Sequence, residues 1–230
     1  MRRVGPMPSH GDNYVLKADR SGHGRLRMIC LVHDSDSREL LRKAGLAPGF
    51  RTVEFGCGLG TISRWIAAEG GAAIGIDLSQ AQIEEARRAA AQAGITDVEF
   101  RVDDIYDCAL PDGQFDLVSC RWLLVHLNRP VNALKTMHRL LKPGGCAVCE
   151  EVDISGVHAE PLSEAYTQYR DFAIKIGEAR GVDYEGGRKV HRWARDAGFE
   201  VEHVAARHPH YVAGEEKGHG AGPSPKPDKA

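Results

Sequence analysis

The chain has 230 residues, of which 42% are hydrophobic and 27% charged, and its formal net charge is −2. This length suits one globular domain with a sizeable core, and so small a charge gives no long-range attraction for nucleic acid. The start of the chain lacks the apolar stretch of a secretion signal, and no run of apolar residues approaches the ~18 that cross a membrane. We therefore expect a cytoplasmic protein that binds neither nucleic acid nor membranes.

Strand-like and helix-like patterns alternate along the chain, which predicts an α/β fold with a doubly wound, mostly parallel sheet. Strands are expected at residues 52–55, 72–77, 98–102, 115–120 and 146–152. Apolar residues at helical spacing predict helices at residues 25–44, 59–68, 80–93 and 131–141. The first of these helices precedes the first strand, so it could close over a ligand or simply pack against the sheet. Pro143, Gly144 and Gly145 are expected to form a turn before the fifth strand.

The C-terminal part is harder to fit into such a sheet. A helix at about residues 188–197 and a sixth strand at 199–206 are expected, but from Gly214 onward the chain is rich in Gly, Pro and Lys without an apolar run. Such a segment cannot bury enough apolar area to become ordered. We expect an N-terminal segment at residues 1–24, a folded domain at 25–212 and a disordered tail at 213–230.

No candidate for a seventh strand is apparent. Either residues 205–212 bend into a short hairpin, or the sheet lacks its closing strand. In the second case the open edge could be covered by another copy of the chain. A homodimer is therefore one expectation.

A glycine-rich turn follows the first predicted strand. Gly56, Gly58 and Gly60 stand in the pattern G-x-G-x-G, and Asp77 ends the next strand 21 residues after Gly56. Glycines let backbone N–H groups approach a ligand, and an acid at this distance suits ribose hydroxyls. A dinucleotide site wants G-x-G-x-x-G, and Thr61 occupies the place of its third glycine. The pattern predicts a nucleoside crevice and disfavours NAD.

Several motifs occur together in one order along the chain. Glu54 precedes the glycine turn, Asp104 follows the third strand, Phe115-Asp116-Leu117-Val118 forms the fourth, and Leu141-Lys142-Pro143-Gly144-Gly145 precedes the fifth. With Gly56, Gly58, Gly60 and Asp77, these resemble the motifs of class I S-adenosylmethionine-dependent methyltransferases, although the usual acid at the place of Glu54 is Asp. The resemblance covers about residues 14–211 and implies a Rossmann-like fold and S-adenosylmethionine as cofactor.

The resemblance also implies roles for individual residues. The glycine turn, with Glu54, would hold the amino-acid end of the cofactor, Asp77 the ribose, and Asp104, in preference to Asp103, the adenine amino group. Apolar or charged residues would complete the cofactor site. These are Tyr14, Leu78, Ile105 and Arg121. Tyr14 could instead be surface packing, and Leu78 and Ile105 could belong to the core.

The segment after the fourth strand would line the acceptor site. In it His126 is the expected catalytic base, although it could equally cap or pack a short helical turn. Glu150, Glu151 and Asp153 form an acidic cluster that could orient an acceptor, and a solvated strand end explains them too. Cysteines and histidines are scattered without the spacing of a metal site, so no metal is expected.

Chain features narrow the expected acceptor to a small molecule. The fourth strand continues as Ser119-Cys120-Arg121-Trp122, which lacks the [ND]-P-P-[YF] motif of enzymes that methylate DNA bases or glutamine. No insertion is large enough to recognise a nucleic acid. Methyl transfer to a small molecule is therefore expected, at an oxygen, nitrogen or carbon. The alternatives are a cofactor-binding relative that acts as a regulatory or partner subunit and, less favoured, an NAD-type oxidoreductase.

Overall fold

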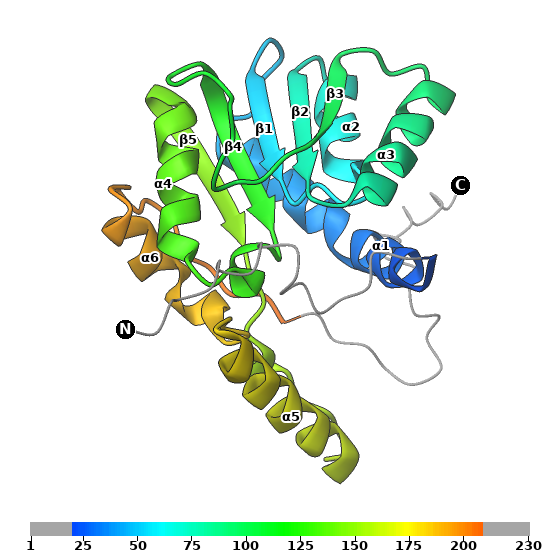
Figure 1. Ribbon diagram of the computed structural model, residues 1–230, viewed down its shortest axis with the longest axis vertical. Coiled ribbons are helices and arrows are strands. Elements are labelled where there is room, and N and C mark those ends of the chain that lie inside the picture. Colours follow the sequence, from blue (N-terminus) through cyan, green and yellow to red (C-terminus); the bar gives the residue numbers. More distant parts are fainter. Residues whose placement is uncertain (1–19, 209–230) are drawn as a thin grey trace, which may run out of the picture.

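The computed structural model describes residues 20–208. Its five strands are parallel and follow the order β3-β2-β1-β4-β5, which confirms the predicted doubly wound architecture (Figure 1). The strands are β1 (Arg51–Phe55), β2 (Ala72–Asp77), β3 (Val98–Val102), β4 (Phe115–Arg121) and β5 (Leu141–Glu150). Because the strand order reverses between β1 and β4, a crevice opens at their carboxyl ends.

Helices cover both faces of the sheet. They are α1 (Arg20–Lys43), α2 (Thr61–Ala68), α3 (Gln80–Gln92), α4 (Pro130–Leu140), α5 (Glu164–Arg180) and α6 (Val190–Asp196). On one face α1 and α2 pack through Leu41, Ile62 and Ile66 against Leu117 of β4. On the other face lie α4 and α6, which also contact each other. Among the described residues, no helix is both long and apolar enough to cross a membrane.

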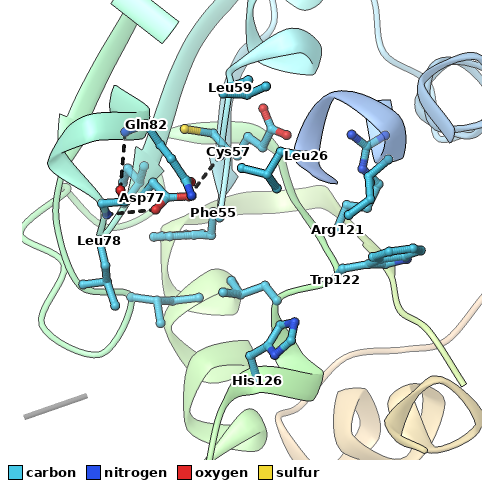
Figure 2. Close-up of a pocket in the computed structure, with 18 of the residues that line it drawn as sticks. Leu26, Phe55, Cys57, Leu59, Asp77, Leu78, Gln82, Arg121, Trp122 and His126 are labelled. Atoms are coloured by element: carbon cyan, nitrogen blue, oxygen red, sulfur yellow. Dashed lines mark hydrogen bonds between the residues drawn. The ribbon is translucent and has the colours of Figure 1, made fainter. Parts of the chain in front are cut away.

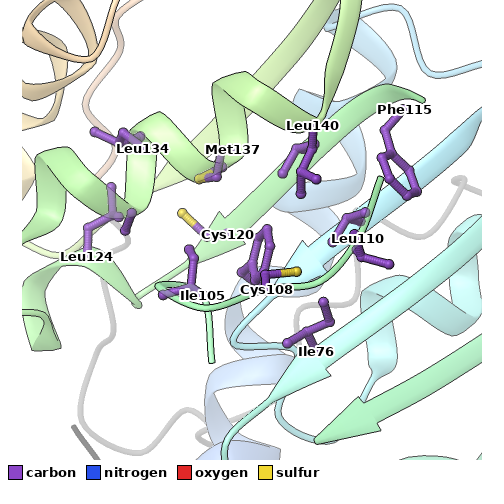
Figure 3. Packing of buried hydrophobic residues seen from close by; sticks show 14 of the residues in the cluster. Ile76, Ile105, Cys108, Leu110, Phe115, Cys120, Leu124, Leu134, Met137 and Leu140 are labelled. Atoms are coloured by element: carbon purple, nitrogen blue, oxygen red, sulfur yellow. The ribbon is translucent and has the colours of Figure 1, made fainter. Parts of the chain in front are cut away.

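The largest cluster of buried residues lies between α4 and the sheet. Leu134, Met137 and Leu140 of α4 are fully buried and face Phe115 and Cys120 of β4 (Figure 3). Burial of each such side chain contributes about 1.5 to 3 kcal/mol relative to exposure. This packing fixes α4 and, through it, the loop between β4 and α4 that borders the crevice.

Strand β5 begins earlier than predicted. Leu141 pairs with Phe115 and Cys146 pairs with Leu117, so residues 142–145 bulge opposite Asp116. Gly144, at φ 79°, lies within this bulge. The expected turn before residue 146 is therefore a bulge inside the strand, because residues on both sides of it keep pairing with β4.

The predicted sixth strand at residues 199–206 is wrong. This segment is assigned neither to a strand nor to a helix, and Val204 is 65% exposed. Phe199 instead packs its ring edge-on against His138 of α4, 4.9 Å away. An alternating pattern makes a strand only where a neighbouring strand accepts its backbone hydrogen bonds, and within residues 20–208 β5 is the last strand on that side.

Helix α5 is not among the elements predicted from the sequence. It extends away from the sheet below the end of β5 (Figure 1), capped at its start by the hydroxyl of Ser163, which accepts from Tyr166 N–H, and at its end by Gly181 at φ 70°. Tyr169 and Phe172 on this helix are more than half exposed. Its apolar residues therefore give no clear core-facing stripe.

Some expectations fall outside the described residues. Tyr14 and the tail at 213–230 belong to this group, so their roles stay predictions, as does the homodimer.

Helix α1 begins at Arg20, five residues before the predicted start. The helix expected at 188–197 is a short 3₁₀ turn, Gly186–Lys189, that continues into α6.

Candidate active site

A cavity of about 250 Å³ opens at the carboxyl ends of β1, β2 and β4 (Figure 2). Helix α1 contributes Leu26 and Ile29 to its wall. Most of the residues predicted for the site line it. They are Glu54, Gly56, Gly58, Asp77, Leu78, Asp104, Ile105, Arg121 and His126. The ends of four strands and helix α1 thus bring to one place residues from Arg25 to Leu127.

The glycine loop joins β1 to α2. All three glycines have positive φ, 68° at Gly56, 52° at Gly58 and 67° at Gly60, a conformation that residues with a Cβ adopt at a cost. A Cβ on Gly58 would meet nothing closer than 3.7 Å. Gly58 therefore exposes bare backbone to the cavity.

Gly60 has another role than predicted. It does not line the cavity, and a Cβ on it would lie 2.5 Å from Phe100 Cζ and 2.9 Å from Ala86 Cβ. These atoms belong to β3 and α3. Gly60 is therefore a packing glycine that lets the start of α2 approach α3, and the structure does not bring it to the ligand side of the loop.

Asp77 ties the loop to the end of β2. Its Oδ2 accepts a hydrogen bond from Gly58 N–H at 3.0 Å, and its Oδ1 accepts one from Ser79 N–H at 2.9 Å. Burial raises the pKa of this carboxyl, although both N–H groups oppose the change. A carboxylate has about four acceptor positions, so Asp77 keeps capacity for further donors from the cavity.

Glu54 is buried beneath the loop. Its Oε2 accepts hydrogen bonds from the backbone N–H of Ser63, at 2.9 Å, and from the Ser63 hydroxyl. Burial raises the pKa of Glu54 to about 7, against the opposing effect of these hydrogen bonds and of the Arg121 charge. Glu54 therefore anchors α2 to β1 as well as lining the cavity.

Arg121 fastens α1 to the end of β4. Its guanidinium donates to Asp34 Oδ1 and to Ser37 Oγ, both at 2.9 Å, and Thr61 donates to the same Asp34 oxygen at 3.2 Å. The side chains of Arg121 and Asp34 are only 11% and 15% exposed. This ion pair holds helix α1 over the cavity.

Asp103 and Asp104 border the cavity after β3. Asp103 Oδ1 accepts from Asp104 N–H and Asp104 Oδ1 accepts from Tyr106 N–H, each at 2.9 Å. Each carboxylate therefore makes one backbone hydrogen bond and keeps other acceptor positions. Ile105, which follows, is 5% exposed and packs in the core as well as lining the cavity.

The segment after β4 is held in an unusual conformation. Trp122 has φ 52°, the one positive φ among non-glycine residues in the described part of the chain, and its N–H donates to Glu150 O at 2.7 Å. Glu151 then accepts from the N–H groups of Leu123, Leu124 and Val125, at 3.0, 2.7 and 3.4 Å. These contacts offset the cost of the backbone at Trp122 and position its side chain at the cavity wall.

The side chains of the acidic cluster make contacts within the protein. The Glu151 carboxylate binds backbone, and Asp153 caps a 3₁₀ turn through Ser155 and pairs with Arg188 at 2.7 Å. Glu150, Glu151 and Asp153 do not line the cavity. Within residues 20–208 no three His, Cys, Asp or Glu side chains are grouped so as to hold a metal ion.

His126 ends the 3₁₀ turn η2 (Leu124–His126) and faces the cavity (Figure 2). Its ring meets that of Tyr184 edge-on, with centroids 5.4 Å apart. Burial, with a smaller effect of the Arg25 charge, lowers the pKa of His126 to about 4. The imidazole is therefore neutral at pH 7 and a weak base.

Comparison with known proteins identifies the family of this chain. Residues 53–149 match a family described as a methyltransferase domain. A ubiquinone biosynthesis O-methyltransferase of Pseudomonas paraeruginosa is 31% identical over 171 residues, which are 70% of this chain and 69% of that protein. The chain belongs to the class I S-adenosylmethionine-dependent methyltransferase family.

Two further proteins are similar to this chain, one in sequence and one in structure. An uncharacterized methyltransferase of Schizosaccharomyces pombe is 31% identical over 164 residues, and the match spans 67% of this chain but only 58% of the relative. The crystal structure of a SAM-dependent methyltransferase from Aquifex aeolicus superposes with a TM-score of 0.57 at 18% identity, covering 74% of this chain and 82% of that one. The latter comparison supports the fold alone.

Some residues that line the cavity were not predicted from the sequence. Trp122 lies inside the segment that the sequence analysis assigns to the acceptor site, so its approximate position could be predicted. Its positive φ could not be predicted from the sequence. Cys30 and Gln82 also line the cavity. Their helices were predicted, yet which side of α1 or α3 would face the crevice depends on contacts between distant segments.

Proposed function

We propose that this protein transfers a methyl group from S-adenosylmethionine to a small-molecule acceptor. The observation that carries the proposal is the hydrogen bond from Gly58 N–H to Asp77, which joins the glycine loop and the expected ribose acid in one cavity. The 31% identity to a ubiquinone biosynthesis O-methyltransferase supports a small acceptor.

The cavity residues fit this cofactor. A Cβ at Gly58 would fill part of the cavity next to this residue, and Asp77 retains acceptor positions for ribose hydroxyls. We assign the loop, Glu54 and Arg121 to the amino-acid end. Glu54 and Arg121 would act mainly by positioning, because their polar atoms already bind Ser63 and Asp34.

The adenine end would lie near β3. Asp104 is assigned to the exocyclic amino group, with Leu78 and Ile105 on either side of the ring. Leu78 is 44% exposed without a ligand, which suits a residue whose apolar surface a flat ring would cover. Tyr14, outside the described residues, is proposed to cover the cofactor from the N-terminal side.

The bound cofactor supplies an already activated methyl group, so the protein's task is mainly to position the acceptor. Trp122, Leu123 and His126 would form the acceptor wall, and Leu26 and Ile29 of α1 would exclude water. Neutral His126 can accept a hydrogen bond from an acceptor hydroxyl. Its low pKa makes complete proton removal from a neutral acceptor inefficient.

Ligand binding tests this proposal. S-adenosylmethionine and its demethylated product should raise the melting temperature, whereas NAD should not, because only a ligand of the folded state stabilises it. Asp77→Asn should weaken cofactor binding by roughly 1.5 to 3 kcal/mol, or about 10- to 150-fold. Asp97→Asn, at an exposed position before β3, serves as the matched control.

Two outcomes would count against the proposal. Equal stabilisation by NAD would contradict the choice of cofactor, and unchanged affinity in Asp77→Asn would contradict the ribose assignment. Methyl release from labelled cofactor should then be followed with phenols, amines and acids. Tight cofactor binding without turnover on the whole panel would favour the alternative of a regulatory subunit.

A further inference from the structure

The two ends of the cavity differ in charge. The carboxylates that line it are Glu54 in β1, Asp77 at the end of β2, and Asp103 and Asp104 directly after β3. The segment that contains His126 contributes Arg121, Trp122, Leu123 and Leu127 to the lining, and the charge of Arg25 acts on the imidazole. This segment brings no carboxylate to the cavity, and its own cation, Arg121, is already paired with Asp34.

Arg25 has no anionic partner within the described part of the chain. No ion pair or side-chain hydrogen bond involves its guanidinium, although its side chain is partly buried. Arg27, two residues later on α1, pairs with Glu85 at 3.7 Å and is 67% exposed. A cation that lines a cavity and lacks a counterion is a ready binding group for an acid.

Two carboxylates next to the segment after β4 are already engaged. The carboxylate of Glu151 contacts the segment that follows β4, but its oxygens already accept hydrogen bonds from three backbone N–H groups. Asp34 is engaged by Arg121 and Thr61. An ammonium acceptor would thus face Arg25 and a sulfonium with no compensating negative charge.

Trp122 gives this end a flat apolar wall. Its ring packs against His33 of α1, with centroids 5.0 Å apart and planes inclined by 59°. The contacts of Glu150 and Glu151 with the backbone hold Trp122 in place despite its positive φ. A fixed indole favours a ligand with its own ring.

We propose that the methyl acceptor is an aromatic acid, whose carboxylate pairs with Arg25 and whose ring lies against Trp122. This inference rests on the proposed function and adds the substrate class.

Three small probes share a phenol ring and differ in one ortho substituent, which is anionic in salicylate, neutral in salicylamide and cationic in 2-hydroxybenzylamine. Their binding is measured by calorimetry on the full chain saturated with S-adenosylhomocysteine. We expect wild type to bind salicylate at least about tenfold more tightly than the other two. Arg25→Gln should lose this preference, Arg25→Lys should keep part of it, and Arg27→Gln should behave as wild type.

Several results would overturn the inference. One is failure of salicylate to bind the complex, or equal affinity for all three probes. Another is unchanged salicylate affinity in Arg25→Gln, and a third is a loss of S-adenosylhomocysteine affinity in that variant, which would assign the guanidinium to the cofactor. If wild type does not bind S-adenosylhomocysteine at all, the proposed function itself fails, so the two failures are distinguishable.

Discussion

Replacement of Gly60 by alanine should destabilise the fold much more than the same replacement of Gly58. Both residues have positive φ, which costs alanine about 1 to 2 kcal/mol. Only at Gly60 would the new Cβ also collide, with Phe100 and Ala86, and overpacking of a core adds about 1 to 3 kcal/mol. We expect losses of about 2 to 5 kcal/mol for Gly60→Ala and about 1 to 2 kcal/mol for Gly58→Ala.

Urea denaturation of the two variants measures this difference, and titration with S-adenosylhomocysteine completes the test. Gly58→Ala should bind at least about tenfold more weakly than wild type, because its Cβ enters the cavity. Whatever fraction of Gly60→Ala remains folded should bind nearly as wild type does. Equal denaturation midpoints for the two variants would refute the division of the loop into a packing glycine and a binding glycine.

Two further predictions concern buried charges. Glu54 has a pKa of about 7 in the folded protein against 4.5 in the unfolded chain, so its stabilising effect is complete below pH 4.5 and is lost as the pH rises through 7. Glu54→Gln keeps an acceptor for Ser63 and does not titrate. Between pH 5 and 8 the free energy of unfolding of this variant, relative to that of wild type, should therefore rise by about 3 kcal/mol in urea denaturation. Parallel pH profiles of the two proteins would contradict the raised pKa of Glu54. Arg121→Leu and Asp34→Leu should each cost about 3 kcal/mol and the double variant far less than their sum; strictly additive losses in denaturation would show that the ion pair does not fasten α1.

The cofactor half of the site could be predicted because its signals are local. Glycines after a strand, and an acid at the end of the next strand, report the backbone geometry of one β-α-β unit, so Gly58 and Asp77 were found together. Gly60 belongs to the same motif but faces Phe100, and the motif does not tell which glycine faces a ligand and which faces the core.

The proposed acceptor half of the cavity could not be predicted in the same way. Its charge depends on Arg25 of α1, and its shape on Trp122, which is held by residues at the end of β5. The error at residues 199–206 has a related cause, since an alternating pattern cannot reveal whether a partner strand is beside it. Helix α5 was not predicted because its apolar residues Tyr169 and Phe172 are exposed and do not form a buried face.

Helix α1 connects the two halves of the cavity. Asp34 near its middle is fixed to Arg121, the residue that precedes Trp122, while Arg25 near its start lines the acceptor end. One buried ion pair therefore positions both the cation and, through His33, the aromatic wall. It follows that Asp34→Leu, which leaves Arg121 in place, should weaken acceptor recognition more than cofactor binding, because Gly58 and Asp77 are joined by a contact that does not involve α1.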